Sequence, residues 1–391
     1  MANRRELLKG MAAAGLGTAL PGVAWAGGTG EARLLVLILR GAMDGLHAVP
    51  PVGDRDYARL RGDLALSNRG ETPALDLDGP FALHPALAPI HPWFAANELA
   101  VVHATALPYR ERSHFDAQNL LENGTGRPFG RTSGWLNHAV QHGDPAPMAM
   151  ARAIPLILRG PAEVTSGNPL RTWAPDNAFL DRVADLYTED PELQFALEQG
   201  VQTQAMLEVH REEAMIESGG RGDELARSAE VIGRMLGAAD GPRIAVAESG
   251  GWDTHTGQQG VLNRQFDALA RALTNLRAGL GDRWSTTAVL VVTEFGRTAH
   301  PNGTGGTDHG TGSVAFLAGG AVNGGRVYGD WPGLASRHLL DGRDLAPTSD
   351  LRSVFKGVLA AHLGVADSLL EDTVFPNSRQ AVPWTELIRT T

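Results

Sequence analysis

Short, uninterrupted runs of apolar residues recur along the chain, and they constrain its fold more than any other feature. The first, Leu34–Leu39, is too short for a core helix and lacks the alternation of a half-exposed strand. It is typical of a strand that is buried on both faces of a parallel sheet. Comparable runs occupy Leu99–His103, Ile154–Leu158, Ile244–Ala247, Ala288–Val292 and Val314–Leu317.

Helical patterns lie between several of these runs, notably at Gln118–Glu122, Asp223–Leu236 and Val261–Leu280. Strands that alternate with helices predict a doubly wound α/β fold, in which helices cover both faces of a mostly parallel sheet. A further helix is predicted within Ser349–Leu363, with Ser349 or Asp350 as its N-cap.

The stretch at about 165–220 has a different character, because its later part is polar and helix-rich at Leu180–Tyr187 and Pro191–Glu217. We interpret it as a helical insertion in a single domain that spans residues 27–391. A division of this length into two domains is the alternative.

The first 26 residues have the parts of a secretory signal: a charged start, a short apolar middle and a small-x-small end at Ala24-Trp25-Ala26. The adjacent Arg4 and Arg5 favour export through the twin-arginine machinery. An ordinary N-terminal helix is the alternative, although glycine and proline interrupt the run. Cleavage after Ala26 is expected to leave a periplasmic or secreted protein without stable membrane insertion, because the apolar run is shorter than a spanning helix requires.

The composition agrees with such a destination and excludes one class of partner. The chain has no cysteine, and a large domain can bury enough core without disulfides. Its net charge is −10, and removal of the signal would make it more negative. No basic stripe is present, so nucleic acid is not expected as a partner.

Carboxylates and histidines gather after the apolar runs, where ligands bind in open α/β sheets. Single residues of this kind have ordinary explanations: Asp44 could be a turn residue, and Asp253 with His255 could form a local hydrogen-bonded loop. Together they predict a metal site, because oxygen and imidazole ligands without thiolate suit zinc, manganese, magnesium or calcium. The predicted metal ligands are Asp44, Asp253, His255, Glu294, Asp308 and His309.

Ser113 is the predicted nucleophile, since it stands where a helix begins after the second apolar run. Free amides and the helix dipole at that position favour an anionic ester, and a metal can activate the hydroxyl. The alternative role for Ser113 is an ordinary N-cap. His114 and Asp116 are further candidates, with exposed positions on the helix surface as their alternative. The arginines predicted to hold an oxyanion are Arg110, Arg112 and Arg297.

Two other catalytic motifs are absent from the sequence. No Gly-x-Ser-x-Gly elbow supports an esterase triad. No Walker loop or complete Gly-x-Gly-x-x-Gly follows the first run, so a nucleotide cofactor is not expected.

Taken together, the motifs resemble the exported domain-of-unknown-function family 1501, which is grouped with the alkaline phosphatase and sulfatase-like superfamily. The resemblance covers nearly the whole chain after the signal. Its motifs are Leu39-Arg40-Gly41-Ala42-Met43-Asp44-Gly45-Leu46, Arg112-Ser113-His114-Phe115-Asp116-Ala117-Gln118, Gly251-Trp252-Asp253-Thr254-His255, Thr293-Glu294-Phe295-Gly296-Arg297-Thr298, Gly305-Gly306-Thr307-Asp308-His309-Gly310 and Gly324-Gly325-Arg326-Val327-Tyr328-Gly329.

The resemblance implies an alkaline phosphatase-like fold with one or two divalent ions. It implies that Asp44 bridges toward the nucleophile's metal, that Ser113 is the nucleophile, that Asp253 and His255 bind the other metal, and that His309 is the last metal histidine. Glu294 and Phe295 replace the usual Asp-His pair, so one imidazole is missing. Either Asp308 and His309 supply it, or one site has only oxygen ligands.

The sequence thus predicts an exported, metal-dependent hydrolase or transferase that acts on a phosphate or sulfate ester, small or polymeric. The alternative is a non-catalytic exported binding protein that keeps the fold and a structural metal. A carbohydrate sulfatase is disfavoured, because the residues around Ser113 do not match the motif that is oxidised to formylglycine.

Overall fold

The structure is a computed structural model that describes residues 31–140, 147–151, 153–168, 177–218 and 224–390. The signal predicted at residues 1–26 lies outside the described residues. Among the residues that are described, no helix combines the length and apolar character needed to cross a bilayer.

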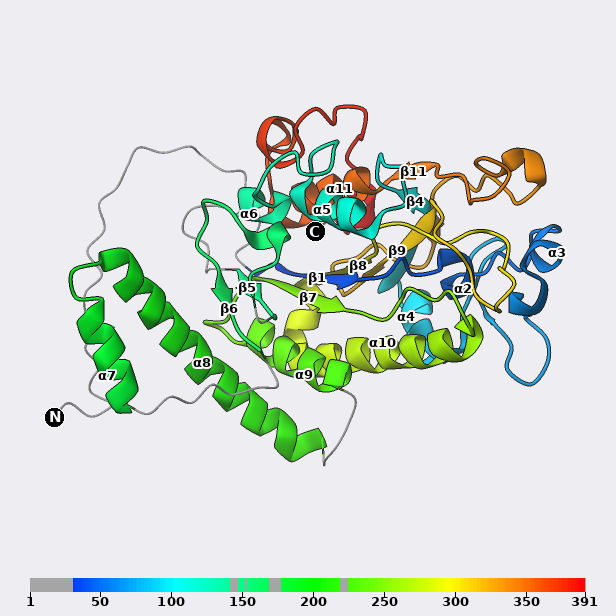
Figure 1. The fold of residues 1–391 in the computed structure, drawn as a ribbon. Helices are drawn as coiled ribbons and strands as arrows, with labels where there is room; N and C mark the ends of the chain where they lie inside the picture. The colour runs from blue at the N-terminus through cyan, green and yellow to red at the C-terminus, as the bar shows by residue number, and fades with distance from the viewer. Residues whose placement is uncertain (1–30, 141–146, 152, 169–176, 219–223, 391) are drawn as a thin grey trace.

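A mostly parallel sheet forms the centre of the molecule, in the order β10-β4-β9-β8-β1-β7-β5-β6, with β11 paired to β4 (Figure 1). Its strands are β1 Arg33–Leu39, β4 Leu99–Ala106, β5 Met148–Ala149, β6 Thr165–Ser166, β7 Ile244–Ser249, β8 Thr287–Val292, β9 Ser313–Ala318, β10 Val327–Tyr328 and β11 Ser349–Asp350. A separate antiparallel pair consists of β2 Leu75–Asp76 and β3 Ala82–Leu83.

Strand β1 is buried along its whole length because helices cover both faces of the sheet. Leu35 and Leu37 point into one apolar core and Val36 and Ile38 into the other, as the period of two requires. Figure 1 shows α4 (His91–Ala95), α9 (Glu224–Gly237) and α10 (Gln258–Leu280) on one side of the sheet. On the other side lie α5 (His114–Asn123), α6 (Trp135–Ala139) and α11 (Leu351–Leu363). The predicted fold class is therefore confirmed.

Strand β9 runs antiparallel to both of its neighbours, β4 and β8. The residues that precede β9 consequently lie at the same edge of the sheet as the residues that follow β1, β4, β7 and β8. This reversal brings the loop 293–312, between β8 and β9, to the edge where the carboxyl ends of the parallel strands meet.

Five of the six apolar runs form strands, and the prediction for Ile154–Leu158 is wrong. Its last part is a short 3-10 helix, Leu156–Leu158, preceded by Pro155. Proline has no N–H to donate to a sheet ladder, and its φ of −64° suits the entry to a helical turn. On the side of β7 away from β1, the paired strand is β5, which is only two residues long.

The main predicted helices are confirmed, and α11 shows how local sequence sets a helix start. Asp350 is its N-cap, and the carboxylate accepts the hydrogen bond from the Arg352 N–H, which has no acceptor within the helix. The region predicted as an insertion contains α7 (Asn177–Leu186) and α8 (Pro191–Ser218), which Figure 1 shows beside the main body. The other α-helices of the described residues are short: α2 Gly45–Ala48, α3 Tyr57–Arg61 and α12 Asp367–Leu369.

Candidate metal centre

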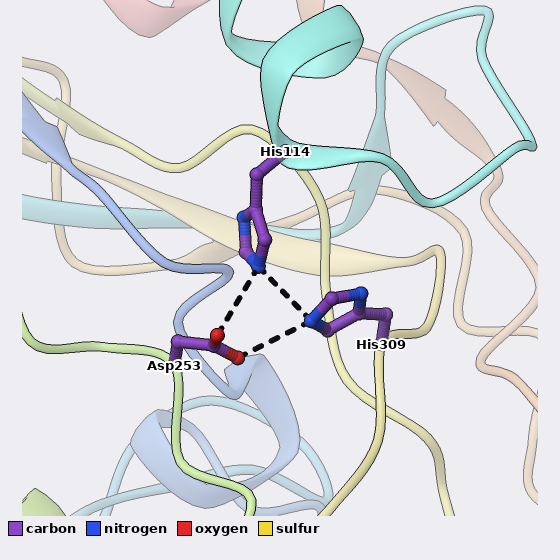
Figure 2. Close-up of side chains that lie close together, drawn as sticks. All are labelled: His114, Asp253 and His309. Atoms are coloured by element: carbon purple, nitrogen blue, oxygen red, sulfur yellow. Dashed lines mark hydrogen bonds and ion pairs between the residues drawn. The ribbon is translucent and has the colours of Figure 1, made fainter.

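Three histidines and one aspartate come together at the edge of the sheet described above. His114 is the first residue of α5, Asp253 and His255 lie in the loop after β7, and His309 precedes β9. Figure 2 shows the side chains of His114, Asp253 and His309 pointing toward one another from three different segments. One potential ligand atom from each of these three lies within 4.8 Å of the others.

The ring of His114 is held by a buried carboxylate on its far side. Its Nδ1 lies 2.7 Å from Oε1 of Glu294. The same oxygen accepts the N–H of Gly41 and the amide of Gln118, each at 2.9 Å. An ionised carboxylate only accepts, so the Nδ1 of His114 carries a proton, and in the neutral ring Nε2 presents a lone pair to the cluster. This hydrogen bond also raises the pKa of His114.

His309 and His255 are held in the same manner. Nδ1 of His309 donates to the carbonyl oxygen of Arg112 at 3.0 Å, and Nδ1 of His255 lies 3.3 Å from Oδ1 of Asp308. Each acceptor fixes the tautomer in which Nε2 is unprotonated. Burial lowers the pKa of His309, which favours the neutral ring.

The carboxylate of Asp253 lies at the meeting point of the three rings. Oδ1 lies 3.0 Å from Nε2 of His255 and 3.3 Å from Nε2 of His309, and Oδ2 lies 3.5 Å from Nε2 of His114. Burial alone would raise the pKa of Asp253, but the 2.6 Å hydrogen bond from Arg297 outweighs burial and lowers it. The carboxylate is therefore ionised at neutral pH.

The distances between the ring nitrogens are compatible with a cation held between them. Nε2 of His309 lies 3.0 Å from Nε2 of His114 and 3.1 Å from Nε2 of His255. One proton can bridge only one of these two contacts, whereas a metal ion could accept lone pairs from several side chains at once. For a tetrahedral zinc with bonds of about 2.0–2.1 Å, neighbouring ligand atoms are about 3.3 Å apart, which is close to the spacing of these two pairs.

The cluster is open to solvent on one side. The side chains of His114 and His309 are 22% and 27% exposed, and those of Asp253 and His255 are both 43% exposed. An ion or a substrate can thus reach the ligands from solution. Solvent-exposed ligand atoms that are oriented by buried groups, here Glu294 and Arg297, are expected of a site that binds external molecules.

Two glycines allow the loops to approach one another closely enough to form this cluster. Gly41 has a φ of +120°, and a Cβ there would lie 2.5 Å from the backbone nitrogen of Asp253. At Gly306, a Cβ would lie 2.3 Å from the carbonyl carbon of His255. Any larger residue at either position would push apart the segments that carry the ligands.

The structure places Glu294 and Asp308, both predicted as metal ligands, against Nδ1 of His114 and of His255. Oε1 of Glu294 is occupied by three donors, and Oε2 accepts the hydroxyl of Thr293 at 3.0 Å. Oδ1 of Asp308 faces His255 and accepts the amide of Asn302 at 3.2 Å. Both carboxylates lie behind the rings, where they orient imidazoles that would bind the metal.

Asp44 is also placed differently from its predicted role as a ligand. It is 1% exposed, and Oδ2 accepts hydrogen bonds from Arg61 and Gln258, each at 2.6 Å. Its Oδ1 accepts the N–H of His47 and caps α2. Burial would raise the pKa of Asp44, but the guanidinium of Arg61 outweighs it and lowers the pKa. The arginine already neutralises this carboxylate, so the structure gives Asp44 a supporting role.

Arg297 was predicted to hold an oxyanion, but its side chain is inaccessible to one. The side chain is fully buried, and all three guanidinium nitrogens donate to Asp253 or to Thr307. Arg297 therefore positions Asp253. Arg112 is engaged as well, because its guanidinium binds Asp344 at 2.8 Å. Only Arg110 among the three predicted arginines is exposed, with one nitrogen bound to backbone carbonyls.

Ser113 immediately precedes His114 and occupies the N-cap position of α5, yet its side chain makes no capping hydrogen bond. The alternative of an ordinary N-cap is thus not supported. His114 was predicted only as a candidate catalytic residue. Its position beside Ser113, at the start of a helix that follows a strand, was the available signal for a ligand.

Comparisons with known proteins agree with the motifs. A family model described as "Protein of unknown function (DUF1501)" matches residues 84–374. No curated protein sequence matches the chain.

Two solved structures are similar at low identity, each with a TM-score of 0.36. One is the C-terminal periplasmic domain of EcEptC from Escherichia coli in complex with Zn, 12% identical, with 77% of each chain covered. The other is the phosphonate monoester hydrolase of Agrobacterium radiobacter, 13% identical, with 85% of this chain and 74% of that chain covered. Similarity at this level does not bear on what the present chain binds.

Proposed function

The chain belongs to the family of proteins of unknown function DUF1501, and we propose that it is a metal-dependent hydrolase or transferase that acts on a phosphate or sulfate ester through Ser113. The observation that supports this proposal most directly is the convergence of three imidazole nitrogens and one carboxylate beside that serine. The serine is free of a capping hydrogen bond and stands next to the ligand His114.

We propose that one divalent ion is held by His114, Asp253 and His309, with His255 as the fourth ligand. Three imidazoles and a carboxylate favour zinc, whereas magnesium and calcium favour sites built from oxygen. A single ion is proposed because the ion pair between Asp44 and Arg61 supplies a positive charge where the resemblance implied a second metal.

When bound, a divalent ion supplies Lewis-acid stabilisation of the negative charge that develops on the oxygens of the ester. The chain's own residues supply orientation and the nucleophile. The first amides of α5 have no acceptor within the helix, and the positive end of its dipole favours an anionic group beside Ser113. Arg110 is exposed next to this position and can pair with a further oxygen of the phosphate or sulfate.

In this mechanism, the hydroxyl oxygen of Ser113 forms a bond to phosphorus or sulfur while the bond to the ester oxygen breaks. The departing alcohol takes up the proton that the serine loses. Water, or another alcohol in a transferase, then attacks the serine ester and restores Ser113. His114 and Asp253 remain fixed throughout by Glu294 and Arg297, so the ligand geometry needs no rearrangement during the reaction.

The test is zinc binding followed by a screen for ester hydrolysis. We expect residues 27–391, expressed without the signal, to bind one equivalent of zinc by elemental analysis. The zinc-loaded protein is then assayed with p-nitrophenyl phosphate, bis(p-nitrophenyl) phosphate, p-nitrophenyl sulfate and p-nitrophenyl phenylphosphonate. We expect turnover of at least one of these esters and its loss in Ser113→Ala, which should keep the zinc.

Two outcomes would contradict this proposal. Protein that stays metal-free after incubation with zinc, manganese, magnesium and calcium would exclude the metallohydrolase. Protein that binds zinc but cleaves none of the four esters would favour the alternative, an exported binding protein with a structural ion.

We also propose that the chain is exported through the twin-arginine route, on the basis of Arg4, Arg5 and the apolar segment that follows. Full-length protein in a bacterial host is expected to appear in the periplasmic fraction with Gly27 as its first residue. Replacing Arg4 and Arg5 together with lysine should keep it in the cytoplasm. Unchanged export of this double variant would rule out the route.

A further inference from the structure

Tyr109, in the loop between β4 and α5, contacts two residues at the start of that helix. Its hydroxyl donates to Oδ2 of Asp116 at 3.0 Å. The backbone N–H of Ser113 donates to the same phenol oxygen at 3.3 Å. The side chain of Ser113 also interacts with this phenol. Tyr109, Ser113 and Asp116 thus form one hydrogen-bonded group in which the phenol oxygen is the centre.

The chemistry of these groups sets the direction of each hydrogen bond. An ionised carboxylate can only accept, so the phenol proton points at Asp116. The lone pairs of the phenol oxygen are then left to accept from Ser113, both from its N–H and from its hydroxyl. A serine hydroxyl whose proton points at Tyr109 directs its own lone pairs away from the phenol, which is the orientation that a nucleophile needs.

Packing contacts connect the ring of Tyr109 to the candidate metal centre. It packs against the small cluster formed by Ala42, Ala117 and Phe295. Phe295 in turn packs against the ring of His114, with 4.8 Å between the ring centroids. Burial and the hydrogen bond to Asp116 raise the pKa of Tyr109, so the phenol keeps its proton at neutral pH. The hydroxyl therefore has a fixed place relative to the ligands.

We infer that Tyr109, oriented by Asp116, is a positioning residue for the Ser113 nucleophile. The inference rests on the proposed function, in which Ser113 attacks the ester. Asp116 holds the phenol, and the phenol holds the serine hydroxyl in one rotamer beside the metal ligands. The N-cap position of Ser113 serves this orientation rather than the stability of α5, since its side chain makes no capping bond.

The test uses two readouts on zinc-loaded protein. The first is kcat and KM for whichever of the four esters is cleaved. The second is covalent labelling by diisopropyl fluorophosphate, followed by intact mass and peptide mapping. In labelling, the oxygen of Ser113 forms a bond to phosphorus, the P–F bond breaks, and fluoride leaves with the serine proton. Labelling reports on the reactivity of Ser113 without knowledge of the natural substrate.

We expect Tyr109→Phe to lower kcat and the labelling rate by about 10- to 100-fold, with KM and zinc content unchanged. Asp116→Asn keeps an acceptor oxygen and should retain more of both rates than Asp116→Ala. Tyr187→Phe, in the turn just after helix α7, is the matched control and should behave as wild type. Ser113→Ala should not be labelled. Unchanged zinc content in Tyr109→Phe shows that the cluster is intact.

Failure of the inference and failure of the proposed function give different results. If the wild type cleaves an ester and Tyr109→Phe cleaves it at the same rate, the positioning role is overturned while the hydrolase stands. If the wild type cleaves no ester, labelling decides: modification of Ser113 that depends on Tyr109 supports the inference. Absence of labelling, or labelling that Tyr109→Phe does not slow, overturns it.

Discussion

Replacing His309 with alanine is expected to lower the affinity of the protein for zinc by more than about a hundredfold, beyond the range typical of residues that only orient a ligand. Nε2 of His309 lies within 3.3 Å of ligand atoms from His114, His255 and Asp253, so its loss opens the centre of the cluster. Zinc affinity is measured by competition with a chromophoric chelator.

Glu294→Gln provides a graded comparison for His309→Ala. In the wild type, the carboxylate of Glu294 orients His114 without binding the ion. We therefore expect the variant to lose about 10- to 100-fold in zinc affinity. The control is His300→Ala, in the same loop, where the side chain is exposed. His309→Ala with the zinc affinity of the wild type would contradict the assignment. Equal losses in His309→Ala and Glu294→Gln would contradict the distinction between ligand and support.

Acidification below pH 6.5 is expected to destabilise the folded protein strongly. Burial lowers the pKa of His47 and His103 to about 4 and that of His84 to about 3. In the unfolded chain the three titrate near 6.5, so below that pH the unfolded state binds more protons. The stability they contribute is present above pH 6.5 and is lost as the pH falls toward 4. A shift from 6.5 to 4 corresponds to about 2 kcal/mol per residue at pH 5 and about 3 kcal/mol at pH 4.

Urea unfolding at pH 8, 6.5 and 5 tests this expectation, with chelator present throughout so that metal release does not contribute. His103→Gln removes one titrating group. Glutamine can donate to the carbonyl oxygen of Val49, as Nε2 of His103 does at 3.0 Å. The variant should lose about 2 kcal/mol less than the wild type between pH 8 and pH 5. A wild type with the same free energy of unfolding at pH 8 and pH 5 would refute the argument.

Most of the fold could be predicted from local sequence. The apolar runs at β1, β4, β7, β8 and β9 are long enough and apolar enough to be strands wherever they are placed. The exception, Ile154–Leu158, contains Pro155, whose missing N–H was a signal against a strand. The antiparallel direction of β9 was not predicted. Strand direction depends on connections and partners, which apolar character does not encode.

The candidate site was predicted in part. Asp253, His255 and His309 were named as ligands, and the structure brings them together. Ligands and their supports use the same residue types, so Glu294 and Asp308 could not be distinguished from ligands by sequence. Asp44 could not be recognised as paired, because its partner Arg61 belongs to a helix that the motifs do not include.

The sequence by itself determined the five longest strands of the sheet and which polar residues follow them, because hydrophobic periodicity and chain direction act locally. Only the tertiary structure decided which of those side chains face one another and which lie behind them. That arrangement depends on which lone pairs face a common point, and the packing of the loops sets it. The loops approach closely at Gly41 and Gly306, and strand β9 is reversed. These two features bring His114, Asp253 and His309 to that point. Glu294 and Arg297 form hydrogen bonds to His114 and Asp253 from the far side.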